Sequence, residues 1–197
     1  MMRRIFLLLL ISMAAGTGCR SDSDNGNIRV EIETGEGDIV IELYLKKAPQ
    51  SVKAFLEIID KGYYKNCSFY RVLNNDNQPS NAPKAELVQG GLWNRTKKRP
   101  ELPKVVHETT QQTGLHHKRG TVSLARESPG TATSEFFICM EDQPGLDFGG
   151  ENNPDGQGYA AFGRVIKGMD VVNKIFRKPE SDQYFDPPVP IYSIERY

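Results

Sequence analysis

Apolar and charged residues alternate near the start of the chain, most clearly along residues 28–33 and again along residues 39–44. A period of two residues is typical of a strand with one buried face. Two glycines within residues 35–38 separate the segments and supply a turn. The pattern therefore predicts a β-hairpin.

The period changes after this hairpin. Between Val52 and Ile59 the apolar residues recur at intervals of three and four, which is typical of a helix with one apolar face. Pro49 lies at an early helical position, where its missing N–H costs nothing, and Gly62 ends the segment. Because a helix with a single apolar stripe must cover something, we expect it to close one end of a barrel.

A second helical stretch opens after Gly168 and places Met169, Val172 and Phe176 on one face, and Pro179 stops it. Prolines then exclude a helix until the final strand, which we expect over residues 191–197. Between the two helices, short apolar segments separated by turn residues predict further strands, at residues 68–73, 87–89, 120–125, 136–140 and 160–165.

Strands dominate this pattern, and it contains neither an internal repeat nor a transmembrane helix. We therefore predict a mainly β fold, an antiparallel barrel that is closed or nearly closed and so exposes no edge. The chain of 197 residues, with 38% hydrophobic residues, eighteen Gly and twelve Pro, is long enough for one loop-rich β domain. Its 25 basic and 25 acidic residues balance, so net charge gives no support for nucleic-acid binding.

The pattern of the N-terminal residues predicts a targeting signal. A basic start is followed by an apolar run over residues 5–15, which is too short to span a bilayer of about 30 Å and is typical of a secretory signal. Cys19 follows at once, and this order resembles a bacterial lipoprotein signal. Gly16 departs from the usual aliphatic residue, so an ordinary signal peptide with a chance cysteine remains the alternative.

These features divide the chain into three parts. We expect a signal peptide over residues 1–18, a lipid-anchored flexible tether over residues 19–27, and one folded domain over residues 28–197. The protein would then be exported and lipid-anchored, through Cys19, to a membrane of a bacterial cell envelope, on its periplasmic or surface side.

The candidate chemistry lies in four segments. Arg71 follows two aromatic residues, Gln89 precedes two glycines, Phe136 and Phe137 are adjacent, and a fourth segment spans residues 161–165. In this order the segments resemble the cyclophilin family of peptidyl-prolyl cis-trans isomerases, over roughly residues 28–197. The resemblance implies a closed eight-stranded antiparallel β-barrel with two capping helices, an isomerase activity and no cofactor.

Isomerisation of an X-Pro bond requires no nucleophile and no proton transfer, only better binding of the twisted amide than of the planar isomers. A guanidinium holds its charge and presents fixed donors, so Arg71 suits the amide carbonyl. The resemblance assigns catalysis to Arg71 and Gln89, and the floor of the proline pocket to Phe137. It assigns substrate contacts also to Leu87, Leu146, Tyr159, Ala125, Arg126, Glu135 and Tyr70.

The sequence departs from the family at several positions. Glu86 replaces a phenylalanine of the pocket wall, so either an inserted loop supplies another apolar group or the pocket is more open and polar. Gly145 replaces the tryptophan of drug-sensitive members, and we therefore predict poor cyclosporin binding. Two stretches, residues 74–84 and 92–118, are longer than usual, and they either add partner contacts or are simply tolerated.

Other reactive residues show no catalytic pattern. His107, His116 and His117 are expected to be solvated loop histidines, and the serines at 123 and 134 lack the ordered His and Asp partners of a hydrolase. No spacing indicates a metal site. Cys67 and Cys139 are expected to be buried thiols, with a disulfide as the alternative in an oxidising compartment.

Two functions remain. The first is an enzyme, expected to be monomeric, that accelerates X-Pro isomerisation in proline-containing exported polypeptides as they fold. The second is a cyclophilin-like module or chaperone that binds proline-containing segments with weak or no turnover. Glu86 and the inserted loops favour the second function, whereas Arg71, Gln89 and Phe137 together favour the first.

Overall fold

A computed structural model describes residues 26–93 and 100–197. The expected signal peptide, Cys19 and most of the tether lie outside the described residues. No helix in the described part has the length and apolar character needed to cross a membrane.

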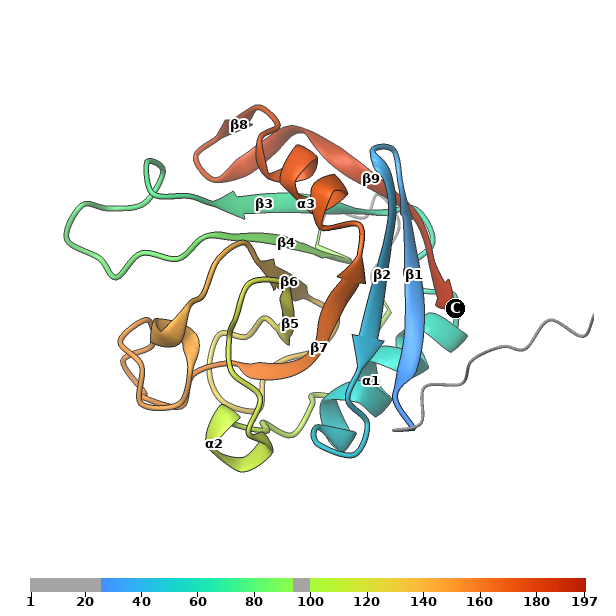
Figure 1. Cartoon of the computed structure of the whole chain (residues 1–197), viewed down its shortest axis with the longest axis horizontal. Helices are drawn as coiled ribbons and strands as arrows, with labels where there is room; N and C mark the ends of the chain where they lie inside the picture. The colour runs from blue at the N-terminus through green and yellow to red at the C-terminus, as the bar shows by residue number, and fades with distance from the viewer. Residues whose placement is uncertain (1–25, 94–99) are drawn as a thin grey trace, which may run out of the picture.

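The fold is an antiparallel β-barrel, shown in Figure 1. Its strands follow the order β1-β2-β7-β5-β6-β4-β3-β9, and pairing of β1 with β9 closes the ring, as predicted. The strands are β1 (Ile28–Thr34), β2 (Gly37–Leu43), β3 (Cys67–Leu73), β4 (Leu87–Gly91), β5 (Thr121–Leu124), β6 (Phe136–Cys139), β7 (Ala160–Lys167), β8 (Glu180–Ser181) and β9 (Tyr184–Arg196).

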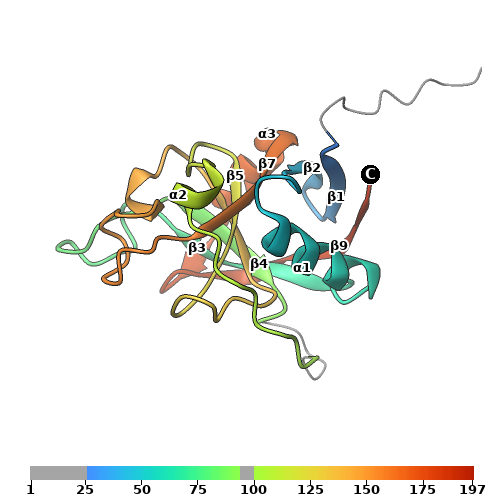
Figure 2. The same ribbon diagram turned by 90° about the horizontal axis from the view of Figure 1, so that it is seen from below.

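Two helices cover the barrel ends. In Figure 1, helix α3 (Met169–Phe176) lies over the upper end of the barrel and helix α1 (Pro49–Asp60) over the lower end, which faces the viewer in Figure 2. Phe55 of α1 is buried against the rings of Phe136 and Phe162, at centroid distances of 5.5 and 5.1 Å. The apolar stripe of the first predicted helix therefore seals the core. The short helices α2 (Thr110–Thr113) and η1 (Pro144–Leu146) were not predicted.

The C-terminal region differs from the sequence prediction. Strand β9 begins at Tyr184 rather than at residue 191, and β8 forms a two-residue strand that pairs with its start. Pro187 and Pro188 fall between the paired stretches of β9, where their missing N–H groups interrupt no ladder. The prolines excluded a helix correctly but did not exclude a strand.

Alternation along the strands separates a core face from an outer face. Phe136 points into the barrel and belongs to the main core, whereas Phe137 belongs to a smaller outer cluster with Ala85, Leu87, Cys139 and Leu146. Adjacent residues of a strand point to opposite faces, so this difference follows from the pleat. The outer cluster is the apolar part of the candidate active site.

Two loops project together beyond this outer cluster. The inserted loop between β3 and β4 and the loop between η1 and β7 extend toward the same side in Figure 1 and Figure 2. Asn152 Nδ2 donates to the carbonyl oxygen of Pro83 across them at 3.3 Å. The inserted loop is held internally by Gln78, whose side chain donates to Asn74 O and Ala85 O. Part of the inserted residues 74–84 is therefore ordered beside the outer cluster and extends the candidate site.

Candidate active site

Three predicted residues lie in one row across three strands. In the barrel wall Arg71 of β3 is opposite Gln89 of β4, and Gln89 is opposite Phe137 of β6. Directly opposite residues of neighbouring strands share a face, and strands are roughly 4.8 Å apart. The sheet therefore holds a guanidinium, an amide and an aromatic ring on one surface within roughly 10 Å.

The guanidinium of Arg71 is fixed from two sides. Its Nη1 donates to Gln89 Oε1 at 3.3 Å, while its Nε and Nη2 donate to Gln183 Oε1 at 3.2 and 2.6 Å. Arginine has five N–H donors, and three are used in these contacts. Among the contacts of the described residues, two N–H groups of the planar guanidinium have no acceptor and remain available to a substrate.

Sequence reasoning missed Gln183. It lies in the turn between β8 and β9, has φ of 75°, and is anchored because its Nε2 donates to Asn77 O at 3.0 Å. Its backbone oxygen also accepts from Val72 N at 2.8 Å. No local signal marks this residue, because its contact with Arg71 spans 112 positions. A glutamine close to the C-terminus therefore positions the predicted catalytic cation.

We expect Gln183→Asn to lower kcat for an Ala-Pro peptide about tenfold with little change in KM. Asparagine tolerates a positive φ but its amide is one methylene too short to reach Arg71, and a hydrogen bond to a charged group is worth about 1.5–3 kcal/mol. Steady-state kinetics over a range of peptide concentrations measures the change. If Gln183→Asn lowers the thermal stability and leaves kcat unchanged, the role of Gln183 is purely structural.

A second set of hydrogen bonds supports Gln89. Its Nε2 donates to Tyr70 Oη at 2.6 Å, and Tyr70 Oη donates to Glu135 Oε2 at 2.8 Å. Glu135 also accepts from Leu92 N at 3.0 Å. Burial and the Glu135 charge raise the pKa of Tyr70 far above its usual value, so the phenol stays protonated and donates. Tyr70 and Glu135, whose predicted contacts with substrate stay predictions, therefore orient the amide of Gln89.

All ten predicted cleft residues line one cleft of about 600 Å³. The inserted loop contributes Pro83 and Ala85 to the same cleft, and Ala85 packs in the cluster of Phe137. Pro83 of the inserted stretch thus supplies another apolar group, the first of the two consequences that the sequence allowed for Glu86, while the cleft also has polar and charged lining residues such as Lys104 and Glu127. The residues brought together are Tyr70, Arg71, Leu87, Gln89, Ala125, Arg126, Glu135, Phe137, Leu146 and Tyr159.

Arg126 borders the cleft, but its guanidinium is already committed. It donates to both carboxylate oxygens of Asp155 at 2.7 and 2.9 Å and to Gly158 O, and it lies 5.3 Å from the ring centroid of Tyr159. Its side chain is 1% exposed. Arg126 therefore fixes the loop that carries Tyr159, and its predicted contact with substrate stays a prediction.

Gly145 is closely covered by its own loop. A Cβ at this position would lie 1.9 Å from Asn152 Oδ1, so a tryptophan there requires the loop to move. Asn152 therefore occupies the space that a side chain at position 145 would take, and poor cyclosporin binding stays our prediction.

The expectation that all three histidines are solvated is wrong for His117. This residue is 1% exposed, its ring stacks at 16° on that of Phe137, and its Nδ1 lies 2.7 Å from Asp147 Oδ1. Its Nε2 lies 3.0 Å from Ser123 Oγ. A carboxylate only accepts, so Nδ1 carries a proton, and in the neutral ring Nε2 then accepts from the hydroxyl.

Ser123 therefore does have ordered His and Asp partners, contrary to the sequence analysis. The serine is 0% exposed and does not line the cleft, so substrate cannot reach its hydroxyl. The three side chains support the pocket floor from behind Phe137 instead. Pairings over 30 positions, such as that of His117 with Asp147, leave no local sequence signal.

We expect stability to fall as the pH drops from about 4 toward 2, in part through Asp147. Burial disfavours its charge, but hydrogen bonds from the side chain and backbone of His117 and from His116 outweigh it and lower the pKa to about 2. The unfolded pKa is 3.8. A depressed folded pKa gives stability that is present above the unfolded value and lost below it. Urea denaturation across this pH range measures the free energy of unfolding, which should decline less steeply for Asp147→Asn than for the parent protein.

Two cysteines complete the description of the site region. Cys67 and Cys139 are both buried and no disulfide joins them in the described structure, which agrees with the expected buried thiols. Burial raises the pKa of the Cys139 thiol well above its usual value, so this group is unreactive.

Comparison with known proteins agrees with this geometry. Residues 29–196 match the family model described as cyclophilin type peptidyl-prolyl cis-trans isomerase/CLD. The peptidyl-prolyl cis-trans isomerase B of Escherichia coli is 38% identical over 143 residues, covering 72% of this chain and 80% of that protein. A peptidyl-prolyl cis-trans isomerase of Acinetobacter baylyi is 38% identical over 150 residues, covering 76% and 72% respectively.

Solved structures give the same result. A Cryptosporidium parvum cyclophilin-type isomerase superposes with a TM-score of 0.67 at 25% identity, covering 87% of this chain and 98% of its own. The barrel thus has a cyclophilin-type fold, and its outer cleft places the apolar cluster of Phe137 beside the guanidinium of Arg71. The chain belongs to the cyclophilin family of peptidyl-prolyl cis-trans isomerases.

Proposed function

We propose that this isomerase acts on X-Pro bonds of exported polypeptides while a lipid on Cys19 holds it at a membrane of the bacterial envelope. The row of Arg71, Gln89 and Phe137 carries the catalytic part of this proposal. A Cryptosporidium cyclophilin of the same fold was crystallised in the presence of the dipeptide Ala-Pro, which supports a proline-containing substrate. The apolar run before Cys19 supports the anchor.

The chemistry follows from the two free donors of Arg71. The prolyl ring packs on Phe137, Leu87 and Leu146, and the guanidinium donates to the carbonyl oxygen before proline. As the C–N bond twists, its double-bond character is lost and the nitrogen becomes an acceptor for the second N–H. A cation held in place beforehand stabilises this state without reorganising. Lowering the barrier by about 6 kcal/mol accelerates exchange about 10⁴-fold.

Two measurements test the proposal. Intact mass of the protein extracted from bacterial membranes should show cleavage before Cys19 and added acyl chains, and Cys19→Ala should abolish both. The refolding of an exported protein that is limited by proline isomerisation should accelerate with the enzyme and not with Arg71→Ala. Binding of the unfolded client without acceleration would instead support the module that only binds proline-containing segments.

A further inference from the structure

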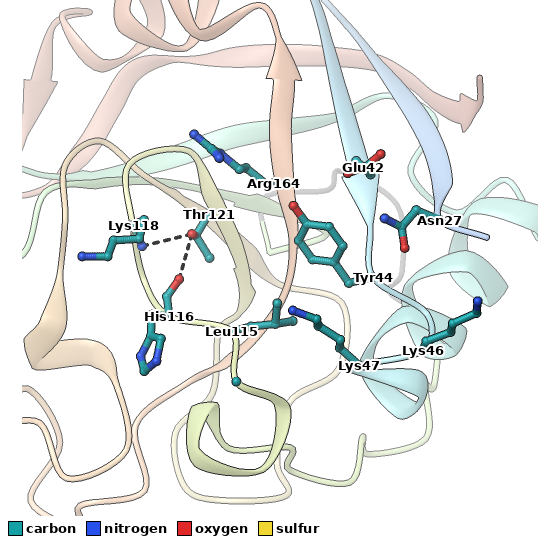
Figure 3. Close-up of a pocket in the computed structure, with 11 residues that line it drawn as sticks. Asn27, Glu42, Tyr44, Lys46, Lys47, Leu115, His116, Lys118, Thr121 and Arg164 are labelled. Atoms are coloured by element: carbon teal, nitrogen blue, oxygen red, sulfur yellow. Dashed lines mark hydrogen bonds between the residues drawn. The ribbon is translucent and has the colours of Figure 1, made fainter. Parts of the chain in front are cut away.

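A second cleft of about 620 Å³ lies on the barrel wall, away from the active site (Figure 3). The end of β2, the middle of β7 and the segment after α2 form it, and it shares no lining residue with the catalytic cleft. Its lining residues are Asn27, Glu42, Tyr44, Lys46, Lys47, Gly114, Leu115, His116, Lys118, Thr121 and Arg164.

This second cleft is cationic in a chain with no net charge. Lys46, Lys47, Lys118 and Arg164 line it, against the single carboxylate of Glu42. Lys118 is paired with Asp142 at 2.9 Å. Among the residues that the structure describes, no ion pair within 4.0 Å joins Lys46, Lys47 or Arg164 to a carboxylate, although Glu42 lies directly opposite Arg164 in the sheet.

The second cleft combines exposed basic side chains with an apolar wall, and Figure 3 shows the charged groups of Arg164, Lys46 and Lys118 directed outward, away from one another. Figure 3 shows the Tyr44 hydroxyl directed toward the side of Arg164, and the Lys47 ammonium directed toward Leu115. Burial and the nearby Glu42 charge raise the pKa of Tyr44, so its phenol stays a donor. Arginine binds phosphate oxygens through two parallel donors, and lysine adds a point charge. The Tyr44 ring and Leu115 supply an apolar wall.

The position of the second cleft indicates where such a phosphate comes from. Asn27 lines the cleft and lies only eight positions after Cys19. Eight extended residues span at most roughly 28 Å. If Cys19 carries the proposed lipid, the cleft can therefore never leave the neighbourhood of the membrane surface. Each Lys or Arg near an anionic membrane surface contributes about 1 kcal/mol of attraction.

We propose that this cleft binds the phosphate of anionic phospholipid headgroups and docks the barrel on the membrane that anchors it. The choice of a lipid as the ligand rests on the proposed anchoring through Cys19. The charge and the lining of the cleft are observed independently of that anchoring. Docking through β2 and β7 leaves the catalytic cleft, whose residues are distinct, available to polypeptides.

Vesicle binding of the full chain tests this proposal. All proteins carry Cys19→Ala, so that any difference arises from the folded domain and not from acylation. The test variant is Lys47→Gln with Arg164→Gln, and the control is Lys167→Gln with Lys174→Gln, which removes the same charge from exposed positions outside the cleft. Partitioning is measured with vesicles of phosphatidylglycerol and phosphatidylcholine in equal amounts and with vesicles of phosphatidylcholine alone.

We expect the test variant to bind the anionic vesicles about 30-fold more weakly than the parent, while the control changes less than threefold, an estimate from two lost contacts of about 1 kcal/mol each. An equal loss in both variants would overturn the proposal, because general charge would then account for binding. Inorganic phosphate that displaces the protein from vesicles at micromolar concentration would also overturn it, since the site would then take free anions.

The isomerase proposal is tested separately. The Lys47→Gln and Arg164→Gln variant should keep the parent's kcat/KM on an Ala-Pro peptide, because neither residue reaches the catalytic cleft. Loss of vesicle binding with full activity supports the docking site. An inactive parent enzyme with normal vesicle binding would contradict only the proposed catalysis.

Discussion

Replacing Arg71 by alanine should lower kcat/KM for an Ala-Pro peptide by about 10²–10³-fold, the usual effect of removing one preorganised donor from a polar transition state. The fold should persist, because Arg71 is half-buried on the outer face of β3 and takes no part in the core. A protease-coupled assay or exchange spectroscopy on the peptide measures the rate. Arg71→Lys should recover only part of it, since one ammonium cannot reach both Gln89 and Gln183 as the fork does.

The control for Arg71 is Arg177→Ala. This exposed arginine follows α3 and does not line the catalytic cleft. Its replacement by alanine removes the same side chain and the same charge as Arg71→Ala. We expect its kcat/KM to match that of the parent. If Arg71→Ala and Arg177→Ala retain equal activity, the guanidinium beside Phe137 is not the catalytic group.

Phe136→Ala should mainly lower stability, whereas Phe137→Ala should mainly lower activity, although the two residues are adjacent. Phe136 is 0% exposed inside the barrel and contacts Phe55, Tyr64 and Phe69, so its loss should cost about 3–5 kcal/mol of stability. Activity per folded molecule should change little. Phe137→Ala should instead lower kcat/KM by about 10–100-fold, because the prolyl ring loses about 1.5–3 kcal/mol of apolar contact.

Urea denaturation and peptide kinetics on the same two variants separate these effects. Phe137 is also buried, so some loss of stability is expected there as well. Rates are therefore compared below the unfolding transition of each variant. A large loss of activity per folded molecule in Phe136→Ala, with none in Phe137→Ala, would place the proline pocket on the wrong face of β6.

The sequence predicted the elements with strong periods most accurately. Helix α1 was expected from Pro49 to Gly62 and spans Pro49–Asp60, because its apolar spacing and its end signals agree. The start of β9 was missed because prolines suggest a loop, and only pairing with β3, including that of Ser68 with Pro190, shows that the chain is extended there. Short turn helices such as α2 carried too few residues to show a period.

The candidate site divides in the same way. Motif residues such as Arg71, Gln89 and Phe137 were found because each lies in a recognisable segment, and the ladder then placed them in one row. The supporting contacts could not be found, since Gln183 lies 112 positions from Arg71 and Asp147 lies 30 from His117. The sequence left open whether the inserted residues 74–84 add contacts or are simply tolerated, and only the structure shows that the loop between β3 and β4 brings Pro83 and Ala85 to the cleft.

The sequence by itself determined the class of fold and the chemical groups of the site, because periodicity and residue type are local properties of the chain. Only the tertiary structure decided that Gln183 holds Arg71 and that His117 is buried, and it showed why Phe137, on the outer face, is available to a cleft while Phe136 lies in the core. Closure of the barrel decides these points. It sets which face of each strand is outside and which distant segments meet there.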